Sequence, residues 1–189
     1  MTFSRETGDR LRRVFRHLNR FMVLMFRLGL GQWLQFWPRV TGQILVLTHT
    51  GRKTGLTRRT PLNFAFVDGD LYVLAGFGSV SDWYRNVKAR PQVEVWLPGG
   101  WWEAEAEEAS DHPERMRILR AVLVGSGFAA YAFGVSPRIP DERLTEISAG
   151  YRLVRLRRTA ARTGPGGPGD LAWVWPAAAT LLLFRRRRG

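Results

Sequence analysis

The chain has 189 residues, 45% of them hydrophobic, which is enough for one domain with a substantial core. It contains no cysteine, which excludes disulfides and thiolate metal sites, and its three histidines (His17, His49 and His112) are scattered, so we predict no metal site. The net charge, 29 − 16 = +13, predicts attraction to an anion: nucleic acid, a lipid headgroup or a phosphorylated small molecule.

Residues 9–28 are predicted to form an N-terminal amphipathic helix. Apolar side chains recur there at spacings of three and four, while most of the arginines fall elsewhere. The apolar positions are Leu11, Val14, Phe15, Leu18, Phe21, Met22, Met25 and Leu28. The segment lacks the uninterrupted apolar run and cleavage site of a signal peptide. Such a helix either packs on a core or lies on a membrane surface, and the sequence leaves both open.

Six extended segments follow, with short helices between them. Apolar and polar residues alternate in several of these segments, and Asp68-Gly69 is typical of a hairpin turn. We expect strands over residues 44–50, 60–67, 71–75, 92–97, 102–107 and 151–158, and helices over 82–90, 111–124 and 141–148. Hairpin-connected strands predict a mainly β, barrel-like domain with added helices. The predicted organisation is a helix and connector (1–40), a β-barrel domain (41–160) and a tail (161–189).

The tail differs in character from the rest of the chain. The segment TGPGGPG (163–169) has the composition of a linker, and residues 171–184 are apolar and precede four arginines. About fourteen helical residues reach roughly 21 Å, which is short of the roughly 30 Å hydrocarbon core of a bilayer. With Trp173 and Trp175 at one end, the tail fits an interfacial anchor beside anionic lipid. Packing of the tail against the barrel is the alternative.

The segment LTHTGRKTGLTRRTP (47–61) carries the strongest signal for a ligand. Gly51 and Gly55 bracket Arg52, Lys53 and Thr54. Glycine permits a tight turn in which backbone N–H groups approach a ligand, and the two cations complete an anion site. A solvated basic turn is the alternative interpretation. The only lysines of the chain are this residue and Lys88.

Other chemical signatures are absent or have simpler explanations. The sequence has no GxSxG, P-loop, strand-linked GxGxxG or HExxH motif. The alternating residues Glu103, Glu105 and Glu107 indicate the outer face of a strand, and His49 indicates a polar strand-end residue rather than a base. Aromatic residues interleaved with arginine on a binding strand are not seen, so we expect no nucleic-acid partner.

Two segments together resemble a known family. TGRKTGLTRRTPL (50–62) and DWYRNVKARPQVEV (82–95) are similar, in order and spacing, to the motifs of the deazaflavin-dependent nitroreductase and quinone reductase family, with an Asp-Gly hairpin between them. The resemblance is close over residues 41–110 and looser to 158. It implies a split β-barrel of the FMN-binding type that binds coenzyme F-420, an 8-hydroxy-5-deazaflavin, with FMN in the same groove as an alternative.

The resemblance also implies roles for individual residues. The phosphodiester and acidic tail would be held at the basic loop, the ring beside two strands, and the groove would be framed by a short helix supported by Lys88. The residues implied are Arg52, Lys53, Thr54, Gly55 and Arg58; Pro61, Asn63, Ala75 and Gly76; and Trp83, Tyr84 and Asn86. Phe77 stands where family members often carry a small polar residue, and Tyr131 is the best candidate for a catalytic proton donor.

The implied reaction is hydride transfer to a small electron-poor acceptor: a quinone, an activated alkene or a nitro compound. We expect a cytoplasmic protein, with peripheral binding to the inner face of the cell membrane through both termini as an extension of that expectation. A homodimer is left open. A non-enzymatic module that binds anionic lipid or coenzyme is the alternative from another functional class.

Overall fold

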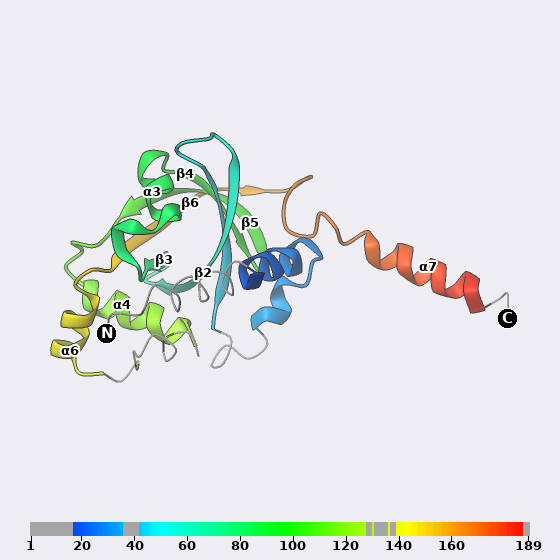
Figure 1. Ribbon diagram of the computed structural model, residues 1–189. Coiled ribbons are helices and arrows are strands. Elements are labelled where there is room, and N and C mark those ends of the chain that lie inside the picture. The colour runs from blue at the N-terminus through cyan, green and yellow to red at the C-terminus, as the bar shows by residue number, and fades with distance from the viewer. Residues whose placement is uncertain (1–16, 36–41, 128–129, 131–135, 137–138, 187–189) are drawn as a thin grey trace, which may run out of the picture.

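The computed structural model describes residues 17–35, 42–127, 130, 136 and 139–186. Six strands form a closed barrel in the order β1-β2-β3-β6-β5-β4, and every neighbouring pair whose register is defined is antiparallel (Figure 1). The strands are β1 (Ile44–Thr50), β2 (Thr57–Val67), β3 (Asp70–Ala75), β4 (Gln92–Leu97), β5 (Gly100–Glu108) and β6 (Arg152–Arg162). The predicted mainly β, split-barrel fold is confirmed.

Alternation along the strands builds the interior of the barrel. Leu45, Leu47, Val95 and Leu156 point inward and are at most 1% exposed. The β2–β3 turn has Asp68 at φ 52° and Gly69 at φ 86°, the two positive values of a tight hairpin turn. The alternation of apolar side chains and the Asp68-Gly69 turn therefore set the register in which the strands pair.

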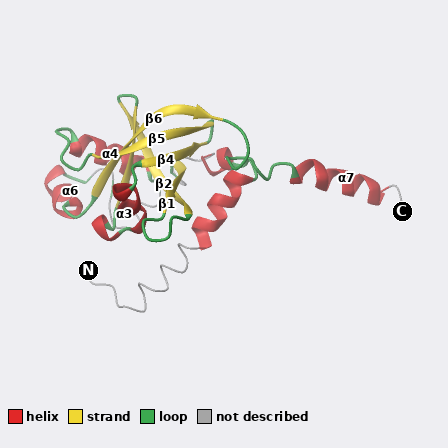
Figure 2. Ribbon diagram, turned by 90° about the horizontal axis from the view of Figure 1, so that it is seen from above, coloured by secondary structure: helices red, strands yellow, loops and turns green. Residues whose placement is uncertain are grey.

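Helices cover the ends and part of the outside of the barrel (Figures 1 and 2). Ile118 and Val122 pack against Ala65 and Tyr72 on the outer side of β2 and β3. Tyr84 belongs to the main core cluster and anchors a second helix to the barrel. The helical elements with defined bounds are η1 (Gly31–Gln35), η2 (Gly78–Val80), α3 (Asp82–Ala89), α4 (Arg115–Gly125), α6 (Asp141–Ser148) and α7 (Val174–Arg186).

Residues 17–27 are helical, and residues 9–16 of the expected N-terminal helix lie outside the described part of the chain. The side of this helix that packs on the barrel centres on Phe26, which is 1% exposed and lies with Met22 against Val46 and its neighbours. Leu18 and Phe21 are 45% and 52% exposed. The packed side is thus rotated from the face that the spacing alone suggested.

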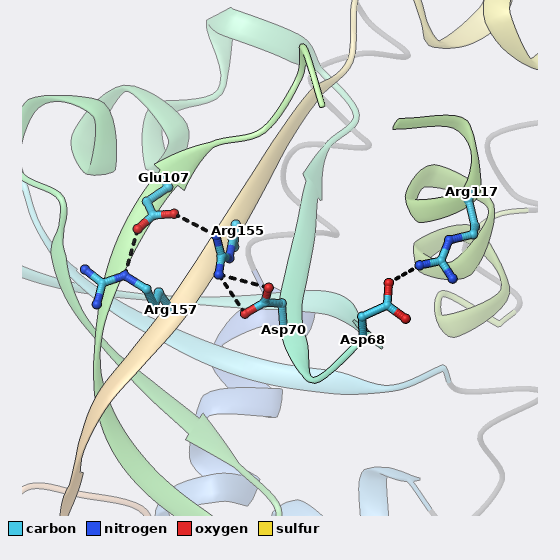
Figure 3. Close-up of polar contacts among 6 residues, drawn as sticks. All are labelled: Asp68, Asp70, Glu107, Arg117, Arg155 and Arg157. Atoms are coloured by element: carbon cyan, nitrogen blue, oxygen red, sulfur yellow. Dashed lines mark hydrogen bonds and ion pairs between the residues drawn. The ribbon is translucent and has the colours of Figure 1, made fainter. Parts of the chain in front are cut away.

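The acidic row of β5 carries cross-strand ion pairs on the outside of the barrel. Arg155 of β6 bridges Asp70 of β3 at 2.9 Å and Glu107 of β5 at 3.4 Å (Figure 3). Arg157 joins Glu107 at 2.8 Å and also contacts Glu105. The predicted outer face is therefore a partly exposed ladder of ion pairs, which solvent screens.

After β6 the chain returns to the N-terminal helix before it leaves the barrel. The Gly169 and Leu171 N–H groups donate to the carbonyls of Phe26 and Arg27, each at 2.9 Å. Arg27 also pairs with Asp170 at 2.9 Å. Beyond these contacts α7 projects away from the barrel in both views (Figures 1 and 2). Among the described helices, none combines the length and apolar character needed to cross a membrane.

Candidate functional site

The basic loop is the β1–β2 hairpin connection, as its glycines predict. The Gly55 N–H donates to the Gly51 carbonyl at 2.8 Å, and the Gly51 N–H donates to the Leu56 carbonyl at 2.9 Å. Gly55 has φ +68°, which side chains other than glycine rarely adopt. Lys53 and Thr54 are exposed at the tip. The turn therefore presents an ammonium group to solvent.

Arg52 points from this loop toward α3. Its Nη2 lies 2.9 Å from Asp82 Oδ1, and its Nη1 donates to Asn86 Oδ1 at 2.9 Å. The backbone N–H of Arg52 donates to the same Asn86 oxygen at 3.1 Å. Arg52 thus joins the loop to the helix, and these contacts compete with its predicted role as a direct ligand for the coenzyme.

Asn86 connects this clamp to a buried histidine. Because both Arg52 donors meet its Oδ1, its Nδ2 faces His49 Nδ1 at 3.3 Å. An amide nitrogen only donates, so Nδ1 accepts and the imidazole proton lies on Nε2, 3.0 Å from Thr60 Oγ1. Burial, with a smaller contribution from the nearby Arg58 guanidinium, lowers the pKa of His49 to about 4. His49 is 4% exposed and neutral at neutral pH.

An open strand edge continues from the loop. β2 pairs with β1 from Thr57 to Asn63, but with β3 only from Phe64 to Val67. Within the described part of the chain, residues 57–63 therefore leave the other edge of β2 without a strand partner. Continuing the β2–β3 register would place Pro61 opposite Gly76 and Leu62 opposite Ala75. Three of the predicted ring-side residues thus border the split, Pro61 on β2 and Ala75 and Gly76 at the end of β3.

Asn63 lies at the far end of this edge. Its Nδ2 donates to the Gln43 carbonyl at 3.2 Å, so the side-chain amide is engaged by backbone. It lies six residue steps along the strand from Thr57 at the loop, a span of about 20 Å. That distance suits an extended ligand with an anionic tail at one end and a flat ring at the other.

The aromatic pair of α3 lies partly inside the barrel. Trp83 and Tyr84 meet edge to face with ring centroids 6.3 Å apart. The Tyr84 hydroxyl donates to Glu108, and burial followed by this hydrogen bond raises the pKa of Tyr84 to about 12. This hydroxyl and Lys88 border a cleft of about 430 Å³ with Arg152. Tyr84 is therefore turned toward β5 and β6 rather than toward the basic loop.

The connection after β3 presents apolar side chains. Phe77 is 66% exposed and Val80 is 64% exposed, immediately after the exposed Gly76. A flat ligand at the split would meet apolar surface here instead of the small polar side chain of many family members. Tyr131, the predicted proton donor, lies outside the described residues.

A second cleft, of about 590 Å³, is lined by residues of β1, β2, β4, β5 and β6. Thr48, Arg59, Glu94 and Arg162 line it, and Arg162 pairs with Glu94 at 2.6 Å. It contains none of the residues predicted for the site. No sequence signal marks it, because five strands and the segment after β6 must come together to form it. Within the described chain, no cluster of three or more His, Asp or Glu residues could hold a metal ion.

The predicted residues thus fall into four places. Arg52 and Asn86 are in direct contact, and the exposed Lys53, Thr54, Gly55 and Arg58 lie on the same hairpin. Pro61, Ala75 and Gly76 lie on the two sides of the split, Trp83, Tyr84 and Lys88 lie along α3, and Asn63 stands apart. His49 and Thr60 were missed as site residues. Exposed cations beside an open, partly apolar edge fit a ligand with an anionic tail and a flat ring.

Solved structures of other proteins resemble this chain. They include a conserved hypothetical protein, Rv2991, from Mycobacterium tuberculosis (19% identity, 64% of this chain and 74% of that chain, TM-score 0.44). A FAD-binding protein from Mesorhizobium loti shares 19% identity over 63% of this chain and 83% of that chain, with a TM-score of 0.43. An F420-H2 dependent reductase, FDR-A, shares 22% identity over 61% of this chain and 94% of that chain, also with a TM-score of 0.43.

A family model gives the more extensive match. It covers residues 19–144, two thirds of the chain, and includes the basic hairpin, the split and α3. Its description is F420H(2)-dependent quinone reductase. The chain belongs to this family of deazaflavin-dependent oxidoreductases.

Proposed function

We propose that this enzyme transfers a hydride from reduced coenzyme F-420 to a quinone or a similar electron-poor acceptor, such as an activated alkene or a nitro compound. The observation that carries the proposal is the exposed Lys53 and Arg58 of the basic hairpin beside the unpaired edge of β2. When bound, the coenzyme supplies the hydride. The protein supplies orientation at the split and charge at the hairpin.

Different parts of the groove would contact different parts of the coenzyme. Lys53 and Arg58 would meet the phosphodiester and acidic tail, since both side chains are exposed and on one hairpin. The backbone at Pro61, Ala75 and Gly76 would border the ring, and Phe77 would add an apolar wall beside the acceptor. FMN remains the alternative cofactor, since the same hairpin would hold its single phosphate.

Titration of the purified protein with reduced coenzyme F-420 tests the proposal. We expect a dissociation constant in the micromolar range or tighter, and turnover with menadione as acceptor. Lys53→Ala should weaken binding about tenfold or more, because a charge-assisted contact is lost. Arg143→Ala is the matched control: it removes one positive charge from an exposed side chain on α6. Absence of coenzyme binding by the wild type contradicts the proposal, and tight FMN binding instead favours the alternative.

We also propose that the enzyme binds an anionic membrane surface from the side where its two ends meet. Much of the exposed apolar surface belongs to those segments. On the N-terminal helix and η1 the residues are Leu18, Phe21, Leu24 and Trp33; at the C-terminal end they are Trp173, Trp175 and Leu181; each is 44–67% exposed.

Contacts between the two ends support one combined surface. The Trp175 indole donates to the Leu28 carbonyl at 2.9 Å, beside the Arg27–Asp170 pair. The thirteen residues of α7 reach about 20 Å, which suits an interfacial helix better than a spanning one. The last two residues of α7 begin a run of four arginines at 185–188, and such clusters favour anionic headgroups.

Flotation of the full chain with vesicles tests the membrane proposal. We expect binding to vesicles containing phosphatidylglycerol and little binding to pure phosphatidylcholine. Leu181→Asp should reduce flotation several-fold, because it places a charge in the apolar layer. Val124→Asp, at a position on α4 that is 58% exposed, makes the same charge change elsewhere and should float normally. Equal flotation of both variants would remove α7 from this role, and self-association without lipid would assign the surface to a second copy.

A further inference from the structure

We propose that His49 is a positioning residue that sets the basic hairpin through Asn86, so that Lys53 is presented to the anionic tail of the ligand. The inference rests on the proposed function for the identity of the ligand. Its structural content is a hydrogen-bonded chain that runs Thr60–His49–Asn86–Arg52–Asp82.

The chain joins three elements that must keep a fixed relation. Thr60 belongs to β2 beside the open edge, Asn86 belongs to α3, and Arg52 belongs to the hairpin turn. The Asn86 amide has only one orientation that satisfies every partner, with Oδ1 toward the two Arg52 donors and Nδ2 toward His49. His49 supports this orientation, because its Nδ1 accepts the Nδ2 proton and would repel the amide oxygen if the Asn86 side chain were flipped.

The geometry favours positioning over acid–base chemistry for His49. Its side chain is 4% exposed and both ring nitrogens are engaged, by Asn86 and by Thr60. Neither ring nitrogen is therefore left free to meet a substrate directly. The low pKa keeps the ring neutral, so the arrangement stays the same across the physiological range.

Arg52 then acts within the protein rather than directly on the ligand. Its guanidinium and its backbone N–H both meet Asn86, and its other end reaches Asp82. By contrast, no hydrogen bond or ion pair within the described chain involves the exposed Lys53 ammonium. Arg52 therefore holds the hairpin against α3, and the next residue, Lys53, is left to contact the ligand.

Two substitutions of His49 separate this role from a general packing effect. His49→Leu fills the space but offers no acceptor, whereas His49→Asn can place its Oδ1 near the position of Nδ1. We expect His49→Leu to weaken binding of reduced coenzyme F-420 about tenfold, with kcat at saturation changed less than about threefold. His49→Asn should restore most of the affinity. His112→Leu, which changes a histidine far along the chain near α4, is the control.

Two readouts need no coenzyme. Nitrogen–proton correlation spectra of the wild type should show a neutral imidazole protonated at Nε2 for His49. Amide hydrogen exchange over residues 51–56 should accelerate several-fold in His49→Leu and remain near wild type in His49→Asn. Unchanged exchange in His49→Leu, or a proton on Nδ1, overturns the positioning role. Failure of the wild type to bind the coenzyme, with the exchange result intact, contradicts the proposed function instead.

Discussion

At the scale of single residues, charged and polar side chains divide between internal contacts and solvent. Arg52 and Lys53 are neighbours in a motif that suggests one shared task, yet one meets α3 and the other is exposed. Tyr84 and Asn86 belong to one short motif, but the Tyr84 hydroxyl meets Glu108 while Asn86 meets His49. Residue type alone could not separate these cases, because each depends on which partner the barrel brings close.

Tyr84→Phe tests the inward role of this tyrosine. The phenol is buried and donates to Glu108, and its raised pKa of about 12 keeps it protonated at neutral pH. Loss of the hydrogen bond should lower the free energy of unfolding by about 1 kcal/mol, or roughly 2–4 °C in melting temperature. Coenzyme affinity should fall less than in Lys53→Ala. A larger affinity loss than in Lys53→Ala, with normal stability, would show that the hydroxyl faces the ligand.

At the scale of elements, the strands and helices follow from sequence more closely than the site does. The alternation of apolar and polar residues and the Asp-Gly turn predict all six strands. β1 and β4 have the expected bounds. β2 begins three residues earlier than expected, because Thr57 to Arg59 extend the β1 pairing on the exposed side of the hairpin. The split between β2 and β3 is not marked in sequence, because strand separation depends on pairing across the barrel. The same limit applies to His49, whose partners come from β2 and α3.

The link between β3 and α3 offers a test at this scale. Gly78 has φ +61°, and a Cβ there would lie 2.2 Å from the Gly150 carbonyl oxygen. Gly78→Ala must therefore strain the backbone and push η2 away from the turn before β6, at a cost of at least about 2 kcal/mol. Gly99→Ala, whose added Cβ would meet nothing within 4 Å, should melt near wild type. Equal melting temperatures for the two variants would mean that η2 is not held against that turn.

At the scale of the whole molecule, the buried neutral His49 makes the free energy of unfolding depend on pH. The folded protein holds the His49 pKa near 4, while the unfolded chain has the ordinary value of 6.5. Between these values the unfolded state binds more protons, so the free energy of unfolding rises with pH through this window and falls as acid is added. Near pH 4 this protonation lowers the free energy of unfolding by its full amount, about 3 kcal/mol, and above pH 6.5 it has no effect.

Urea unfolding of the wild type and of His49→Leu at several pH values between 4 and 7 isolates this contribution. The wild type should lose more stability than the variant as pH falls from 6.5 to 4, because the variant has no imidazole to protonate in the unfolded state. The His112→Leu control keeps the His49 imidazole and should therefore retain the steeper wild-type loss of stability. Parallel curves for wild type and His49→Leu would mean that the imidazole protonates equally in both states. The folded protein would then contain a charged His49 at low pH. Because both nitrogens of a charged imidazole carry protons, Nδ1 could not accept from Asn86 there, and the proposed positioning of the hairpin would be contradicted.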